Sequence, residues 1–306
     1  MLASLFTDKL FAQKAMLDEN SKQWLFDTFS WAIEGFDVKV FKEKTQLVLP
    51  NNSFYPGSVT SVHEMALNVF NHTVNYAGMQ NWPLKLVEPA QFVTSNLPTL
   101  HTPSNAQVNA DSNLQNNLRG NAELKFSFQS IAASYATDAR QLAAAHHTLQ
   151  AKNSEDELDQ SQCIQISYLP SQVNQPQDLI SSFAQQLATL LVLYHPIPPP
   201  GGKEFIPQAI DVLACVLGFG VIFTNTAYQF RGGCGACNNP AANRKSALPE
   251  HEMCYALALF CYLKQVPVAT VLPQLKSHLR GVYKKMAKEI AKQLPQSTEV
   301  ALLALL

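Results

Sequence analysis

The fold is decided by residues 178–231, which read DLISSFAQQLATLLVLYHPIPPPGGKEFIPQAIDVLACVLGFGVIFTNTAYQFR. Two long apolar segments lie on either side of a turn rich in proline and glycine, and this pattern favours two helices joined by that turn. The longest apolar run, residues 212–227, is short for a membrane span and follows closely on Asp211. We therefore predict two buried helices around which the rest of the chain is organised.

The composition limits the classes of function that the chain can have. It has 306 residues, of which 47% are hydrophobic and 15% charged, so it can bury a core of substantial size. The net charge of −1 provides no basic surface for a phosphate backbone, and we expect no nucleic-acid partner and no membrane. Charged residues interrupt the first 23 residues, so we expect no export signal, a cytoplasmic location, and thiols or metal ligands among the 6 cysteines.

The order of predicted elements indicates a helix-dominated α+β fold in three parts. Residues 1–94 combine a helix with a small β-α-β unit, in which residues 45–50 and 82–87 are the strands and Ser58 or Ser61 caps the helix. Residues 95–121 are rich in Asn, Gln and Ser and read as a polar flexible linker or insertion. Residues 122–306 form a helical domain with a strand at 163–169, a cysteine-containing loop at 232–248, and helices at 250–265 and 271–293.

The first central helix has the apolar register of a metallopeptidase helix without its reactive side chains. In an HExxH helix, two histidines at positions i and i+4 bind zinc from one face, and the glutamate activates the metal-bound water. Here Gln185 and Thr189 occupy the two ligand positions, and Gln186 occupies the position of the base. An amide cannot accept a proton from water, and amide and hydroxyl groups bind zinc poorly. Ordinary polar residues on a packed helix are the alternative interpretation, and either way we expect no zinc-hydrolase chemistry here.

Four blocks of the chain carry a family pattern. They are QQLAT at residues 185–189, DVLACVLGFGVIFTNTAY at 211–228, EMCYALALF at 252–260 and SFYPGSVTSVHEMALNVFNHTVNYAGM at 53–79. These blocks resemble a little-characterised bacterial family of zincin-like proteins, related to HExxH metallopeptidases. The resemblance implies a zincin-like fold for residues 122–306, a place for Glu204 near the family's third ligand, and retention of the family's acidic residue at Asp211.

The resemblance and the lost ligands together predict a non-catalytic protein, a pseudoenzyme that binds a protein or small-molecule partner of unknown identity. Its vestigial cleft would comprise Gln185, Gln186, Thr189, Glu204 and Asp211, with His195 expected nearby. One alternative is a metal-dependent hydrolase with ligands drawn from Glu204, Asp211, His195 or the cysteine loop. Another is a structural zinc or redox module built on the cysteine loop. A fold does not by itself determine the reaction that a protein catalyses, so these alternatives stay open.

The cysteine loop is the one candidate metal site in the sequence. Cys234 and Cys237 stand at C-x-x-C spacing, which lets both sulfurs reach one zinc ion or form a redox pair. A structural zinc site needs two more ligands, and no second close pair is present. Incidental thiols in a glycine-rich loop are the alternative. We therefore expect no cofactor, with zinc at Cys234 and Cys237 as the one candidate.

Overall fold

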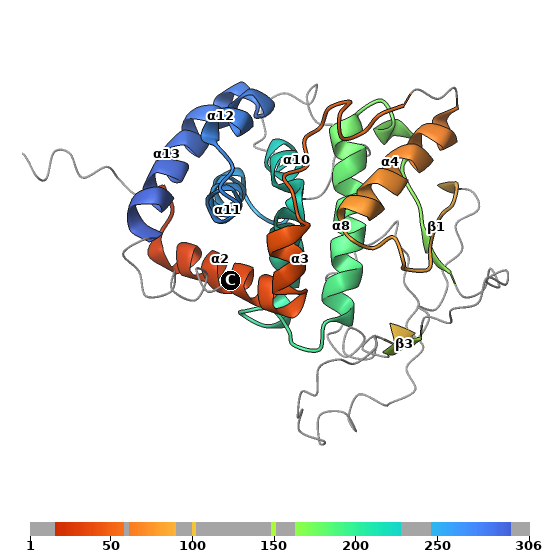
Figure 1. The fold of residues 1–306 in the computed structure, drawn as a ribbon, viewed down its shortest axis with the longest axis horizontal. Coiled ribbons are helices and arrows are strands. Elements are labelled where there is room, and N and C mark those ends of the chain that lie inside the picture. The colour runs from red at the N-terminus through yellow and green to blue at the C-terminus, as the bar shows by residue number, and fades with distance from the viewer. Residues whose placement is uncertain are drawn as a thin grey trace, which may run out of the picture.

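The computed structural model of this chain describes residues 16–57, 61–89, 100–101, 148–150, 163–227 and 246–294. Helices dominate these residues and strands are few and short, as the α+β class predicts (Figure 1). The elements are α2 (Glu19–Gly35), α3 (Val38–Glu43), α4 (Val62–Tyr76), β1 (Leu84–Leu86), β2 (Leu100–His101), β3 (Thr148–Gln150), β4 (Ile164–Ile166), η4 (Pro170–Gln172), α8 (Pro176–Tyr194), η5 (Lys203–Phe205), α9 (Ile206–Ala214), η6 (Cys215–Phe219), α10 (Gly220–Asn225), α11 (Glu250–Leu263), α12 (Val268–Val271), η7 (Leu272–Gln274) and α13 (Ser277–Gln293).

The helix α11 lies at the centre of one half of the molecule. It is apolar on every face, and residues 253–261 are all buried. Such a helix is stable only when other elements surround it, because none of its faces suits water. It packs against α13, α10 and α2, which enclose it in Figure 1. The predicted helix at residues 250–265 is thereby confirmed as the core of this half.

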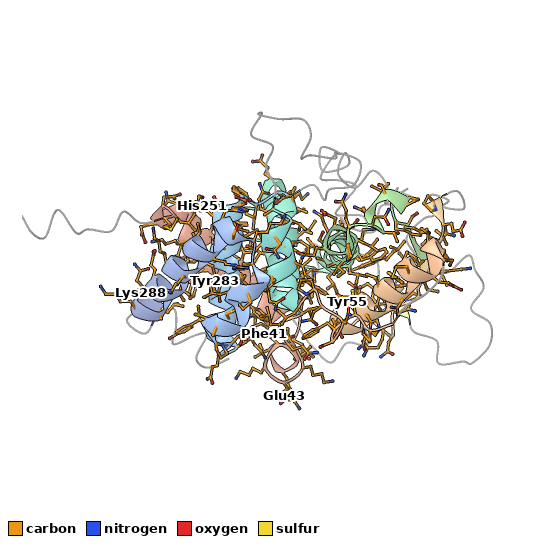
Figure 2. The ribbon with its side chains drawn as sticks, turned by 90° about the horizontal axis from the view of Figure 1, so that it is seen from above. Phe41, Glu43, Tyr55, His251, Tyr283 and Lys288 are labelled. Carbon is orange, nitrogen blue, oxygen red and sulfur yellow. The ribbon has the colours of Figure 1, made fainter. Side chains whose placement is uncertain are left out.

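The helix α13, the last one in the described part of the chain, covers this half against solvent. Its inner face buries Tyr283, Met286 and Ile290, and its outer face is rich in lysine. Figure 2 shows Lys288 extending from the outside of the molecule, while Tyr283 lies closer to the neighbouring helices. This alternation of buried and exposed residues is the amphipathic pattern that the sequence predicts for a covering helix.

The long helix α8 forms the axis of the other half. Proline at its first position and Asp178 in its first turn suit a helix N-terminus, where backbone N–H groups lack partners. One side of α8 packs against α9 and α10, and another side packs against α4 (Figure 1). The helix α4 begins at Ser61, whose hydroxyl group accepts from the Glu64 N–H while the Glu64 carboxylate accepts from the Ser61 N–H. Both helices were predicted from their apolar spacing.

The second central helix is broken, which its uniform apolar composition did not predict. It divides into α9, the π-helical segment η6 and α10, and Gly218 inside it has a φ of 104°. A Cβ atom at Gly218 would lie 2.1 Å from the Gln46 carbonyl oxygen, so only glycine fits. The freed Gly218 carbonyl accepts a hydrogen bond from the Val48 N–H at 2.9 Å. The break in the helix thus binds residues 46–48, which are distant in the sequence, through a backbone hydrogen bond.

The strand predicted at residues 45–50 is wrong for the same reason. These residues run against the break in the central helix and form no strand, and the adjacent residues Leu47 and Val48 are both buried, where alternation would bury only one of them. The strand predicted at 82–87 is present as β1, and it pairs in parallel with β4, with Leu84 opposite Ile164 and Leu86 opposite Ile166. A second parallel pair joins β2 to β3. The predicted N-terminal β-α-β unit is therefore replaced by a sheet that links distant parts of the chain.

One helical stretch in the described part of the chain, Lys203–Asn225, is long and apolar enough to cross a membrane. Most of it is buried inside the fold, and Ile210, Leu213 and Phe223 are fully buried. Burial on all sides by other helices is typical of a core helix. The prediction of a buried central helix is confirmed.

Candidate functional site

The central feature of the candidate site is the side chain of Gln186, which bridges α8 and the end of β4. It is 7% exposed, and its Nε2 donates to the Ser167 carbonyl and to the Ser182 carbonyl, each at 3.3 Å. Its Oε1 atom is buried and has no hydrogen-bond partner. Buried polar atoms in folded proteins nearly always have a partner, so an acceptor left open here is unusual.

The two residues at the ligand positions do not present free polar groups in the way that zinc ligands would. Thr189 is 5% exposed, and its hydroxyl group donates to the Gln185 carbonyl one turn earlier at 2.7 Å. Gln185 is half-buried on the same helix. Positions 185, 186 and 189 therefore share α8, as predicted. They provide hydroxyl and amide groups and no proton acceptor that could activate water.

Asp211 belongs to the scaffold between α9 and α11. It is fully buried, and its Oδ2 accepts from the Ala247 N–H at 2.9 Å, the Leu248 N–H at 3.0 Å and the Ser246 hydroxyl at 3.5 Å. Hydrogen bonds from backbone N–H groups to a carboxylate are among the stronger ones in proteins. Asp211 thereby fixes the segment that leads into α11.

Glu204 lies on the outside of the molecule, in η5 of the loop between α8 and α9. That loop is fastened to α2 by two tryptophans. The Trp31 Nε1 donates to the Ile197 carbonyl at 3.0 Å, and the Trp24 Nε1 donates to the Pro200 carbonyl at 2.9 Å. The predicted cleft residues are thus distributed over three environments. Gln185, Gln186 and Thr189 share one helix, Asp211 lies at a buried junction, and Glu204 faces solvent.

His195 closes the C-terminal end of α8 and is 7% exposed. Its Nδ1 lies 2.7 Å from the Ile197 carbonyl oxygen, and its ring packs against Trp31 and Phe36, with centroids 5.1 Å and 4.9 Å away. The Nε2 atom lies against Gly35, where a Cβ would be only 2.2 Å away. Burial lowers the pKa of His195, although hydrogen bonds to the backbone of Ile197 and Gly35 oppose this shift. The ring is therefore directed at α2 and the loop.

The structure adds residues that sequence reasoning missed at the end of β4. Ser167 is 4% exposed, and its hydroxyl group has no partner. The next residue, Tyr168, lies with its hydroxyl 3.2 Å from His63 Nδ1 on α4. Leu169 and Val62 flank this contact in the sequence and expose 40% and 53% of their surface. No local motif could have found this group, because it comes from segments far apart in the sequence.

No group of three or more His, Cys, Asp or Glu side chains that could hold a metal ion occurs within the described ranges. The cysteines there have free thiols, and burial raises the pKa of Cys254 to about 12 and of Cys261 to about 11. Such thiols are poor nucleophiles and poor metal ligands at neutral pH. The candidate zinc ligands Cys234 and Cys237 lie outside the described residues.

Comparisons with models of protein families, with curated proteins and with solved structures found no match. The resemblance to zincin-like proteins therefore stays a prediction.

Proposed function

We propose that this chain is a non-catalytic binding protein with a zincin-like C-terminal domain, and that its ligand is an extended peptide segment. The ligand would lie at the end of β4, beside the Gln186 amide on α8. The observation that carries this proposal is the Gln186 side chain, whose Nε2 already holds the Ser167 carbonyl while its buried Oε1 accepts nothing. A ligand N–H group directed at that oxygen would complete the bonding of the amide.

The absence of suitable catalytic groups on α8 supports binding over hydrolysis. Gln186 stands where a general base would be needed, and an amide has no useful basicity. The Thr189 hydroxyl donates a hydrogen bond to the Gln185 carbonyl of the same helix. Recognition by hydrogen bonding needs neither basicity nor a metal, and it is the chemistry that these side chains retain.

The end of β4 supports an extended peptide as the ligand. Among the described residues, β4 pairs with β1 alone, and a strand at the edge of a sheet is a template for a further strand. The Ser167 hydroxyl, which is buried and has no partner, adds a second polar group within the same segment. Leu169 and Val62 supply exposed apolar surface close by, which suits an apolar side chain of the ligand.

A selection of random linear peptides displayed on phage, with the purified full chain as the target, tests this proposal. The best peptide is then measured by fluorescence anisotropy against wild type, Gln186→Met and Gln208→Met. Gln208 is the matched control, because its buried Oε1 also lacks a partner but lies on α9. We expect Gln186→Met to weaken binding about tenfold, as loss of one buried hydrogen bond implies, and Gln208→Met to leave it unchanged. Failure to select any peptide, or equal binding by wild type and Gln186→Met, would overturn the proposal.

Restoring the motif tests the zincin-like part separately. The triple variant Gln185→His/Gln186→Glu/Thr189→His recreates HELAH on α8, and the two imidazoles would share one helix face. We expect isothermal titration calorimetry to show zinc binding at α8 in the triple variant, above any zinc that wild type takes up. A triple variant that folds and binds no more zinc than wild type would refute the zincin-like assignment. The peptide-binding proposal would then stand or fall on its own test.

A further inference from the structure

We propose that the solvent-exposed face of α13 binds the anionic surface of a lipid bilayer, with the apolar residues 300–306 as a second point of attachment. The ligand is a bilayer that contains acidic phospholipids. This site is independent of the proposed peptide site, because α13 and β1, the strand that pairs with β4, lie at opposite sides of the molecule (Figure 1).

The exposed face of α13 carries positive charge alone. Its basic residues lie within an arc of roughly 140° at 3.6 residues per turn, and their row is about 18 Å long at 1.5 Å per residue. They are all exposed, and they are Arg280, Lys284, Lys285, Lys288 and Lys292. The other residues of the arc are small, namely Ser277, Gly281 and Ala291. Figure 2 shows Lys288 extending from the outside of the molecule.

No carboxylate in the described part of the chain forms an ion pair with the four lysines of this face. The acidic residue of α13, Glu289, follows Lys285 by four residues, a spacing that allows an ion pair within a helix. Its carboxylate instead pairs with Lys22 of α2, whose side chain is 7% exposed. Arg280 donates to two backbone carbonyls just before α13, which hold its guanidinium group at one end of the row.

The positive face reflects a separation of charge along the chain. Residues 264–293 contain 7 of the 22 basic residues and 1 of the 23 acidic residues. The net charge of −1, from which we expected no membrane partner, conceals this difference. A helix face that only keeps a protein soluble commonly mixes both signs, whereas a face of one sign attracts a partner of the opposite sign.

Two features of the sequence favour a bilayer over an acidic protein or a nucleic acid. Residues 300–306, outside the described ranges, read VALLALL and begin seven residues after Gln293, the end of α13. Such a segment is too short to span a bilayer but can insert into its interface, and stable membrane association combines an apolar anchor with a basic surface. The face of α13 also lacks an aromatic side chain for stacking on bases, because Tyr283 is buried.

The lysines can approach a planar surface together, because they project from one side of a single helix that covers the fold. A basic residue next to an anionic bilayer raises the affinity about fivefold, so the four together raise it on the order of a hundredfold or more. This attraction falls off within a Debye length, about 10 Å at 0.1 M salt, and it therefore weakens as ionic strength rises.

Flotation of the purified full chain with lipid vesicles tests this inference. Vesicles of phosphatidylcholine alone are compared with vesicles of phosphatidylcholine and phosphatidylserine in a ratio of about 2:1. At about 0.1 M sodium chloride we expect binding to the anionic vesicles, and binding at least about tenfold weaker to the neutral vesicles or at about 0.5 M salt. The variant Lys284→Gln/Lys285→Gln/Lys288→Gln/Lys292→Gln should bind the anionic vesicles about a hundredfold more weakly.

The matched control removes the same charge from exposed lysines on other elements, as Lys39→Gln/Lys44→Gln/Lys85→Gln/Lys203→Gln. It should lose less than about threefold in affinity, because these lysines lie outside the face of α13. A third variant, Leu302→Ser/Leu303→Ser/Leu306→Ser, isolates the apolar segment and should weaken binding at least about tenfold. Far-UV circular dichroism verifies that each variant is folded.

The comparison of the two lipid compositions uses wild type alone, so it tests the proposal even where a variant does not fold. Wild type that binds neither vesicle, or both equally, would overturn the bilayer as the partner. Equal losses in the two lysine variants, or full binding by the serine variant, would overturn the assignment to α13 and residues 300–306. Binding of duplex DNA or polyglutamate through the four lysines, without binding of vesicles, would assign this face to another polyanion and would equally refute the proposal.

Discussion

Substitution of Asp211 tests whether this residue stabilises the fold or belongs to a binding cleft. Its Oδ2 accepts two backbone N–H bonds, from Ala247 at 2.9 Å and Leu248 at 3.0 Å, and the carboxylate is fully buried. A hydrogen bond to a charged group contributes about 1.5–3 kcal/mol, and an unpaired buried N–H group costs about 1–3 kcal/mol. Asp211→Ala deletes both bonds and leaves the buried Leu248 N–H without its acceptor. We therefore expect it to lower the free energy of unfolding by about 3–5 kcal/mol.

Asp211→Asn keeps an oxygen acceptor of the same shape but removes the charge, so we expect a smaller loss, about 1–2 kcal/mol. Urea unfolding at pH 7, followed by far-UV circular dichroism, measures both variants, and unchanged m-values confirm that stability alone has changed. Elemental mass spectrometry and peptide anisotropy on the folded variants should match wild type. If Asp211→Ala lowers the free energy of unfolding by less than about 1 kcal/mol, or if a stable variant binds metal or peptide differently, a functional role for Asp211 is favoured over a structural one.

Two further pairs of substitutions test the packing that positions α8 and α11. Gly218→Ala should lower the free energy of unfolding by about 3 kcal/mol or more, because φ is 104° and the new Cβ would lie 2.1 Å from the Gln46 carbonyl oxygen. Gly281→Ala, on the open face of α13, should raise the free energy of unfolding by about 0.5–1 kcal/mol. Thermal unfolding measures both variants, and similar effects would contradict the break at Gly218. Lys22→Met should lower the free energy of unfolding in urea by about 2 kcal/mol, because the buried ammonium group pairs with Glu289 between α2 and α13. Adding Glu289→Gln should recover part of that loss, since it removes the unpaired carboxylate. No recovery in the double variant would mean that the pair contributes nothing.

The helices could be predicted because the signals for them are local. The apolar spacing of residues 62–76 and the Ser61–Glu64 capping box lie within one segment, so the sequence contains everything needed to start and bury that helix. The fully apolar helix α11 also signals its own central position, because a helix with no polar face must be enclosed. These elements agree with the sequence in type and nearly in extent.

The break in the second central helix could not be predicted, because its cause lies far away in the chain. Gly218 reads as one more small residue in an apolar run, and only the approach of the Gln46 carbonyl requires its φ of 104°. The same contact explains the wrong strand at residues 45–50. Leu47 and Val48 are both buried and do not alternate, and the Val48 N–H bonds to the helix break at Gly218 instead of to a neighbouring strand.

The candidate site shows the same division between local and distant causes. The lack of HExxH-type ligands at Gln185, Gln186 and Thr189 could be read from the sequence, since side-chain chemistry is a local property. The grouping with Asp211 and Glu204 followed from the resemblance alone, and these two residues lie at a buried junction and on the outer surface instead. An acidic residue at a position that a resemblance matches need not carry chemistry, because a carboxylate that accepts backbone N–H groups also stabilises the fold.

The bonding of α8 also limits what this helix can recognise. The Thr189 hydroxyl and the Gln186 Nε2 both donate to carbonyls of the protein, so neither has a donor hydrogen directed at a ligand. The Gln186 Oε1 is the buried atom of these two side chains that still lacks a partner. A ligand bound there must therefore bring a donor, and a peptide N–H group satisfies this requirement where a carboxylate or phosphate would be repelled. The proposed preference for amides over anions thus follows from one side-chain orientation.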